Sequence, residues 1–262
     1  MPRVKLVLEY DGTEFVGWQV QPNGRSVQAV VEGALAALLG APVKVAAAGR
    51  TDSGVHALGQ VAAFTAPRAL PLKAYAQGLN GHLPPDVAVV AAEEVPDGFD
   101  PRRWSLGKRY RYLISNRTAR SPLRRRTHWE LFAPLDVEAM RAAAGALVGR
   151  HDFSAFRAAD CQARHAVREV RSLQVSGEAG DEVRVEVEGT AFLKHMVRNV
   201  VGSLVEVGKG RQGAGWVAEV LASRDRTRAG PTAPAHGLCL VEVRMGEGPR
   251  AGAAAEDDGD DG

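Results

Sequence analysis

The stretch Ala46–Phe64, AAAGRTDSGVHALGQVAAF, places a charged loop between two apolar segments. Short apolar runs bounded by turn residues indicate strands, so we expect a strand on each side of the loop. Gly49 and Gly54 lie in the loop, and glycine reaches backbone angles that are closed to other residues. The sequence therefore predicts that Arg50 and Asp52 are held at a fixed place between two strands, as functional side chains on loops commonly are.

Hydrophobic periodicity and turn residues predict the same order of elements twice along the chain. The first half is predicted to hold a strand at 4–9, a helix capped by Ser26 and ended by Gly40, strands at 43–48 and 60–65, a helix at 72–79 and a strand at 87–94. The second half is predicted to hold a strand at 110–115, a helix at 137–148, strands at 167–175 and 183–187, helices at 194–207 and near 215–221, and a strand at 238–243.

Each half has the order βαββαβ, which is that of a ferredoxin-like unit. The predicted fold class is therefore α+β, with two ferredoxin-like halves forming an extended, mainly antiparallel sheet and helices on one face. We expect an N-terminal domain at 1–104 that carries the charged loop, a C-terminal domain at 105–246, and a tail at 247–262. The tail is rich in Gly, Ala and acidic residues, a composition typical of disorder.

Positive charge gathers in one segment of the chain. Residues 101–129 contain no acidic residue, and arginine and lysine alternate there with Trp104, Tyr110, Tyr112 and Trp129. The basic residues are Arg102, Arg103, Lys108, Arg109, Arg111, Arg117, Arg120, Arg124, Arg125 and Arg126. This pattern is typical of a surface that binds nucleic acid. The alternative is a solvated basic face whose aromatic residues point into the core.

Other classes of protein are disfavoured by composition. The sequence has no run of about 18 apolar residues, and its first residues lack the apolar segment of a secretory signal. We therefore predict a cytoplasmic protein that does not insert into a membrane. Cys161 and Cys239 are the only cysteines and lie far apart, so neither a disulfide framework nor a thiolate zinc site is indicated.

Asp52 has two further interpretations besides a functional carboxylate. Aspartate in a loop commonly bonds its own backbone to close a turn. Asp52 and His56 are also four residues apart and could be metal ligands, as in a metal-dependent phosphoesterase. Further ligands at suitable spacing are not evident, which weakens the metal interpretation.

Six motifs together resemble the tRNA pseudouridine synthase A family, in the family's order. They are YDGTEFVGWQVQ (10–21), RSVQ (25–28), GRTDSGVHALGQVAAF (49–64), KRYRY (108–112), FLKHMVRNVVG (192–202) and GLCL (237–240). The resemblance extends from Tyr10 to about Val243. Ser26, where the family more often has threonine, and Ser53, at a variable position, are small departures away from the expected chemistry.

The resemblance implies a reaction in which the N-glycosidic bond of a uridine is cleaved, the base turns, and C5 is joined to C1′. Its implied substrate is tRNA, modified at uridines 38, 39 and 40 of the anticodon stem-loop, with no metal or organic cofactor and with a homodimeric enzyme. The family's essential aspartate falls on Asp52. A carboxylate suits this chemistry because it can attack an electrophilic carbon or remove a sugar proton.

The other site residues are expected to assist Asp52 or to hold RNA. Tyr110 matches the family's active-site tyrosine and is expected to stack on the base. Arg198 is expected to keep Asp52 ionised, since an adjacent guanidinium favours the charged carboxylate; the alternative is a solvated helix charge or a phosphate contact. Substrate contacts are expected from Arg50, Arg109, Arg111, Lys194 and His195. A non-catalytic RNA-binding protein is the alternative function.

Overall fold

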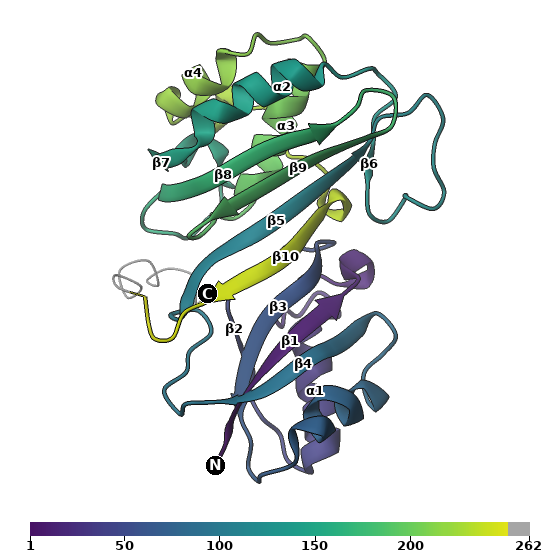
Figure 1. Cartoon of the computed structure of the whole chain (residues 1–262), viewed down its shortest axis with the longest axis vertical. Helices are drawn as coiled ribbons and strands as arrows, with labels where there is room; N and C mark the ends of the chain where they lie inside the picture. Colours follow the sequence, from purple (N-terminus) through teal and green to yellow (C-terminus); the bar gives the residue numbers. More distant parts are fainter. Residues whose placement is uncertain (251–262) are drawn as a thin grey trace. The chain divides into compact units, whose positions relative to one another are not determined.

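The computed structural model describes residues 1–250, so the acidic end of the predicted tail, residues 251–262, lies outside the described residues. The chain forms two compact units (Figure 1). The first unit holds Met1–Leu106 together with the described residues from Leu240 onward. The second unit holds Gly107–Cys239.

The first unit is a sheet with one long helix against it. Its elements are β1 (Arg3–Tyr10), α1 (Val27–Leu39), β2 (Ala46–Ala47), β3 (His56–Thr65), β4 (Val87–Val95) and β10 (Leu238–Met245, from Leu240 on in this unit). The strand order is β4-β1-β3-β10, and β2 pairs with β3. β1 pairs antiparallel with both β3 and β4.

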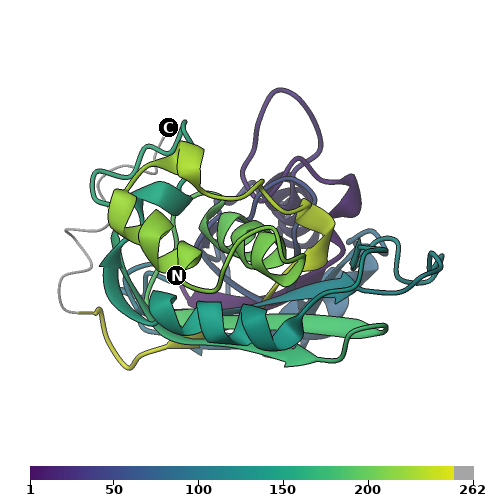
Figure 2. The ribbon, with the colours of Figure 1, turned by 90° about the horizontal axis from the view of Figure 1, so that it is seen from above.

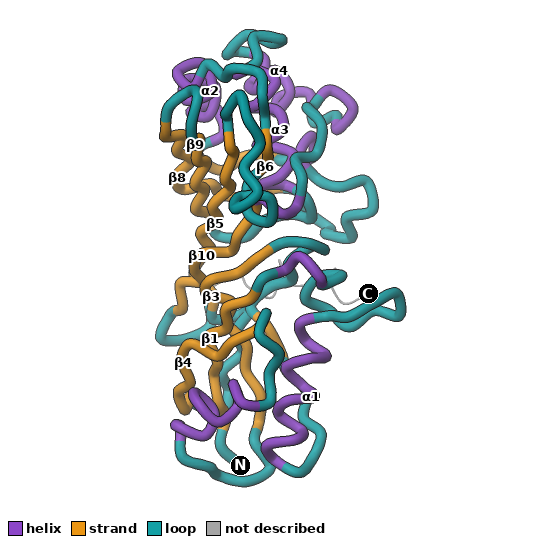
Figure 3. The backbone as a smooth tube through the Cα atoms, turned by 90° about the vertical axis from the view of Figure 1, so that its right-hand side faces the viewer, coloured by secondary structure: helices purple, strands orange, loops and turns teal. Residues whose placement is uncertain are grey.

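The core of the first unit lies between α1 and the strands (Figure 3). Val4, Leu6 and Leu8 are buried on one face of β1 because side chains alternate along a strand. Ser26 caps α1, since its side chain accepts a hydrogen bond from the Ala29 amide at 3.3 Å, and Gly40 ends the helix with φ 75°. The predicted capping of this helix is confirmed.

One predicted element of the first unit was wrong, and a second is helical as predicted but irregular. The strand predicted at 43–48 contains only β2, because side chains of α1 bind the backbone of Val45: Glu32 accepts from its amide at 3.0 Å and Gln28 donates to its carbonyl at 3.3 Å. The helix predicted at 72–79 is a π-helical turn, Ala74–Gly78, followed by a 3₁₀ turn, Leu79–Gly81. The glycines that end these two turns disfavour a regular α-helix there.

The second unit has its helices on one face of a sheet (Figures 2 and 3). Its elements are β5 (Ser105–Ser115, from Gly107 on in this unit), β6 (Trp129–Glu130), α2 (Val137–Ala144), β7 (Gly149–Asp152), β8 (Val167–Gly177), β9 (Glu182–Gly189), α3 (Met196–Gly208) and α4 (Trp216–Ser223). The strand order is β5-β9-β8-β7, antiparallel throughout, and β6 pairs parallel with β5. The predicted α+β class with a mainly antiparallel sheet is confirmed.

α3 begins two residues later than the sequence predicts. His195 precedes it with φ 61°, a left-handed conformation that cannot continue an α-helix backward. β6 and β7 were not predicted, and both are too short to show periodicity. No helix in residues 1–250 combines the length and apolar character needed to cross a membrane.

Gly202 allows a loop of the second unit to lie directly on α3. A Cβ atom at Gly202 would fall 1.7 Å from the Pro231 carbonyl oxygen, so any side chain must push the loop away. We expect Gly202→Ala to lower the free energy of unfolding by about 3 kcal/mol, the upper part of the range for overpacking. Gly145→Ala is the control, because Gly145 has φ −56° and nothing within 4 Å of its Cβ position.

Urea unfolding of the two variants and the wild type measures this difference. Gly145→Ala should be neutral or slightly stabilising, since alanine restricts the unfolded chain at a compatible position. Equal free energies of unfolding for the two variants would contradict the packing described for Gly202.

Candidate active site

The loop that carries Asp52 runs from β2 to β3 in the first unit and is bound by a second loop, residues 11–18. Asp52 forms an isolated antiparallel bridge with Gly17. The Trp18 amide donates to the Thr51 carbonyl at 3.1 Å, and the Gly54 amide donates to the Phe15 carbonyl at 3.2 Å. The backbone on both sides of Asp52 is therefore held by main-chain hydrogen bonds.

Glycines make this close approach of two loops possible. Gly17 has φ +115°, and a Cβ atom there would lie 2.7 Å from the Thr51 carbonyl oxygen. A Cβ atom at Gly12 would lie 2.0 Å from the Val55 carbonyl oxygen. Any other residue at either position would force the Asp52 loop away from its partner.

Side chains add three further hydrogen bonds to the loop. The hydroxyls of Tyr10 and Thr51 lie 2.8 Å apart and share a hydrogen bond. The Gln60 amide donates to the Gly49 carbonyl at 2.8 Å, and the Ser53 hydroxyl donates to the Phe15 carbonyl at 3.2 Å. The loop is thus bound at its start, its centre and its end.

The backbone itself closes the turn at Asp52. The Val55 amide donates to the Asp52 carbonyl at 3.1 Å, and Gly54 has φ 78°. Main-chain atoms therefore close this turn. Thr51 is buried, whereas Arg50 and Asp52 on either side of it are partly exposed.

His56 serves the fold of the loop rather than a metal site. Its side chain is almost buried, and its Nδ1 accepts a hydrogen bond from the Gly12 amide at 3.0 Å. The same nitrogen lies 3.1 Å from a carboxylate oxygen of Asp11. Nowhere in residues 1–250 do three His, Cys, Asp or Glu side chains gather as a metal site would require.

Tyr110 lies on β5 in the second unit, on the face that the helices cover. Its side chain is 8% exposed, and its ring contacts Phe192 edge-on at 5.2 Å between centroids and 84° between planes. Alternation along β5 places Arg109 and Arg111 on the opposite face. Arg111 donates to Glu186 there at 2.9 Å. The two arginines that the sequence groups with Tyr110 therefore do not share its surroundings.

Arg198, on the first turn of α3, is bound to the loop that follows α4. Its Nε donates to the Ala233 carbonyl at 2.8 Å, and the Ala233 amide donates to the Arg198 carbonyl at 3.1 Å. The neighbouring Tyr112 hydroxyl donates to the Pro234 carbonyl at 2.7 Å. Burial raises the pKa of Tyr112, and the positive charge of Arg198 partly opposes that rise. Arg198 is thus a fixed side chain and not a freely solvated helix charge.

A buried polar network supports the same turn of α3. The side-chain oxygen of Asn199 accepts from Thr232 at 2.6 Å and from Arg226 at 3.1 Å. Its side-chain nitrogen donates to the Phe156 carbonyl at 2.7 Å. Because Asn199 is fully buried and follows Arg198 directly, its three partners hold the backbone from which the arginine extends.

Two other predicted substrate residues lie just before α3. Lys194 is exposed, and its ammonium lies 2.6 Å from a carboxylate oxygen of Asp160. The hydrogen bond from Lys194 lowers the pKa of Asp160. His195 occupies the left-handed position at the N-terminal end of the helix. The structure thus places Arg50 and Asp52 in the first unit and the other six predicted site residues in the second.

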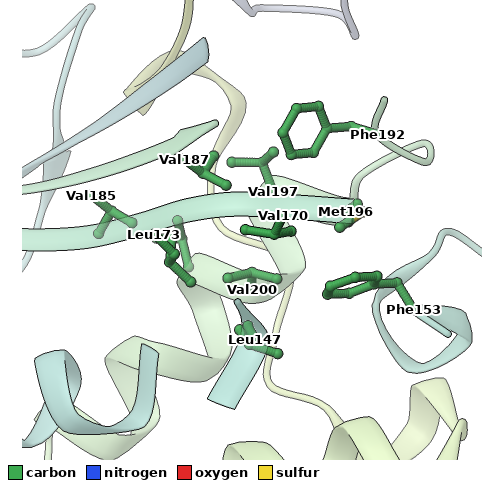
Figure 4. A pocket seen from close by; sticks show the side chains of 11 residues that line it. Leu147, Phe153, Val170, Leu173, Val185, Val187, Phe192, Met196, Val197 and Val200 are labelled. Carbon is green, nitrogen blue, oxygen red and sulfur yellow. The ribbon is translucent and has the colours of Figure 1, made fainter. Parts of the chain in front are cut away.

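Phe192 was not predicted as a site residue. It contacts the Tyr110 ring and also lines a narrow pocket between α3 and the sheet (Figure 4). All eleven residues that line this pocket are apolar, among them Val187, Val197 and Val200, so the pocket belongs to the core of the second unit. Phe192 lies in the motif FLKHMVRNVVG, but no periodicity distinguishes it from the apolar residues around it.

Comparisons with known proteins cover nearly the whole chain. A family model described as tRNA pseudouridine synthase matches residues 6–102 and 143–245. Tyr110 and most of the basic segment lie between the matched ranges. A solved structure of an archaeal box H/ACA sRNP Nop10–Cbf5 complex aligns over 92% of this chain and 57% of that chain with 14% identity and a TM-score of 0.30, so the family assignment rests on sequence.

Curated relatives agree with the family model. A tRNA pseudouridine synthase A from Myxococcus xanthus is 72% identical over 251 residues, which are 96% of this chain and 95% of the relative. Proteins of the same name from Geotalea uraniireducens and Geobacter sulfurreducens are each 51% identical, over 93% and 94% of this chain and 99% and 100% of the relatives. The chain therefore belongs to the tRNA pseudouridine synthase family.

Proposed function

We propose that this isomerase converts uridine to pseudouridine at positions 38, 39 and 40 in the anticodon stem-loop of tRNA, with Asp52 as its essential catalytic carboxylate. The observation that carries the proposal is the bridge between Asp52 and Gly17, which fixes the backbone of an otherwise irregular loop. The names of the relatives support tRNA as the substrate. The target positions come from the motif resemblance described above.

The reaction needs a carboxylate at a defined place. The N-glycosidic bond between N1 and C1′ breaks, the uracil turns while it stays bound, and C5 bonds to C1′; C5 then loses its proton and N1 gains one, so the product is an isomer of the substrate. Asp52 can act as a nucleophile or as a base toward a sugar proton, and both roles require its carboxylate within reach of the reacting nucleotide. A backbone held before the substrate arrives reduces the reorganisation that the reaction requires.

Tyr110 is the residue that we propose contacts the uracil. Phe192 packs edge-on against its ring, which favours one orientation of the aromatic plane. Arg198 is proposed to keep the Asp52 carboxylate ionised, as an adjacent guanidinium does. Both side chains are held by contacts within the second unit, so each has a defined orientation before RNA binds.

Substrate binding is proposed to depend on the basic arm, which we define as residues 117–127 between β5 and β6 (Figure 1). Four contacts hold it in place: Asn116 donates to Leu131 and Ala133 at 2.9 and 2.7 Å, His128 lies 3.0 Å from Glu182, and Arg124 donates to Asp181 at 3.1 Å. Arg117, Arg120, Arg125 and Arg126 are exposed along it. An anchored loop with exposed arginines suits the RNA phosphate backbone.

Arg50 completes the proposed substrate contacts because it is partly exposed beside Asp52. Arg109 and Arg111 lie on the opposite face of β5 from Tyr110. They are therefore proposed to contact RNA on that face and not beside Tyr110. Lys194 and His195 stay predicted substrate contacts. A homodimer and a cytoplasmic location also remain predictions. Sedimentation equilibrium would test the first, and cell fractionation would test the second.

Mapping pseudouridine in an unmodified tRNA transcript tests the reaction and its catalytic residue together. Wild-type protein should produce pseudouridine at positions 38, 39 and 40, whereas Asp52→Asn should produce none and still bind tRNA, because the amide is nearly the same size but cannot serve as nucleophile or base. Arg198→Lys should also lose most activity, since lysine keeps the charge but not the fixed geometry. Activity in Asp52→Asn would overturn the assignment of Asp52, and full activity in Arg198→Lys that of Arg198.

Replacing arginines of the basic arm tests its role in tRNA binding. The triple variant Arg117→Ala, Arg120→Ala, Arg125→Ala should weaken tRNA binding and reduce the slope of log Kd against log salt by about one for each phosphate that an arginine no longer neutralises. The control removes the same charge from exposed arginines of the same unit, Arg141, Arg150 and Arg211. An equal weakening in the two triple variants, measured by filter binding, would show that only net charge matters.

A further inference from the structure

We propose that Tyr10 is a positioning residue, which fixes the peptide bearing Asp52 through its hydrogen bond to Thr51. This inference rests on the proposed function, because it assumes that Asp52 performs the chemistry. It assigns a role in the reaction to a residue at the far end of β1, 42 positions before Asp52 in the chain. Four observations within the first unit support it.

The hydrogen bond between the two residues is short and shielded from water. The hydroxyls lie 2.8 Å apart, and the exposed fractions are 3% for Tyr10 and 6% for Thr51. A hydrogen bond in such surroundings has few competing water partners, so its geometry is well defined. Thr51 directly precedes Asp52, and any rotation of their shared peptide moves the carboxylate.

A β-bulge directs Tyr10 toward the loop. Leu8 pairs with Gln60 and Tyr10 pairs with Ala57, so two residues of β3, Leu58 and Gly59, lie opposite Glu9 of β1. Bulges of this kind bend a strand and change the direction of the side chains beside them. The bulge thus lies directly before Tyr10, opposite the start of β3, where the Asp52 loop ends.

The ring of Tyr10 is itself held in place. Trp18 packs against it with 6.3 Å between ring centroids and 40° between planes. The amide of the same Trp18 donates to the Thr51 carbonyl at 3.1 Å. Thr51 is therefore held by its carbonyl and by its side chain, and both partners belong to one packed pair, Tyr10 and Trp18.

The main-chain hydrogen bonds of the loop are independent of the Tyr10 hydroxyl, so its role in positioning can be tested apart from its role in folding. The main-chain bonds from Trp18 to Thr51 and from Gly54 to Phe15 do not involve the tyrosine hydroxyl. Removing that hydroxyl keeps the buried ring and those main-chain bonds, and it removes the hydrogen bond to the Thr51 side chain. We therefore expect Tyr10→Phe to alter the rate of the reaction more than the stability of the protein or its affinity for tRNA.

The test measures single-turnover rates of pseudouridine formation with enzyme in excess over tRNA. Tyr10→Phe and Thr51→Val should each lower the rate constant about 10-fold, since small displacements of a catalytic group have large effects on rate. Thr51→Ser should react at the wild-type rate, unlike Thr51→Val, because serine keeps the hydroxyl. The double variant Tyr10→Phe, Thr51→Val should be no slower than the slower single variant, as expected for two halves of one hydrogen bond.

Tyr75→Phe is the matched control. Tyr75 is also a buried tyrosine of the first unit, and its hydroxyl donates to the Arg68 carbonyl at 3.4 Å, away from the Asp52 loop. The melting temperature and tRNA Kd should be similar for Tyr10→Phe and Tyr75→Phe, and the rate should fall only for Tyr10→Phe.

Each outcome has a separate meaning. An unchanged rate for Tyr10→Phe, or additive effects on the rate in the double variant, would overturn the positioning role while wild-type activity upholds the proposed function. A fall in melting temperature or tRNA affinity that accounts for the whole decrease in rate would also overturn it. If the wild type forms no pseudouridine, the proposed function itself fails.

Discussion

The close approach of two loops in the first unit is the contact on which the candidate site depends. Gly17 meets Asp52 backbone to backbone, and a side chain at Gly17 would collide with the Thr51 carbonyl 2.7 Å away. The loop of Asp52 has no regular secondary structure of its own, so it needs partners for its backbone polar groups. Residues 11–18 supply those partners. The position of Asp52 therefore depends on Gly12 and Gly17, which allow that segment to approach the loop.

The second unit uses a related arrangement around α3. Gly202 lets the Pro231 carbonyl rest against the helix, and Asn199 is bonded to Thr232 within the same loop. Arg198 extends from that turn and is bonded to Ala233. In both units, the side chains proposed to act in the reaction come from backbone that is bound by a distant segment, and glycine permits the contact. Such sites are preorganised, because the protein folding energy already covers the cost of orienting the side chains.

Much of the fold could be predicted because it follows local rules. The cap at Ser26, the end at Gly40 and the alternation of β1 depend on neighbouring residues only. The failures have separate causes. Val45 leaves the expected strand because side chains of α1 bind its backbone, and α3 starts late because His195 adopts a left-handed conformation. Neither fact is visible in hydrophobic periodicity.

The candidate site shows the same division. The motif GRTDSGVHALGQVAAF was enough to single out Asp52, but the roles of Gly12 and Gly17 require knowing which loop lies against it. Arg109 and Arg111 are instructive because their separation from Tyr110 follows from simple alternation along a strand, a local rule that the motif KRYRY already contains. Treating the motif as one group of site residues hid the fact that its arginines and Tyr110 lie on opposite faces of the strand.

Hydrogen exchange tests most directly whether the Asp52 loop is in place before tRNA binds. The amides of Trp18, Gly54 and Val55 donate to carbonyls in or beside this loop. We expect all three to be strongly protected in the free enzyme, with little change when tRNA is added, because their bonds exist without substrate. Rapid exchange of these amides in the free enzyme, with protection appearing only in the presence of tRNA, would contradict a preformed site.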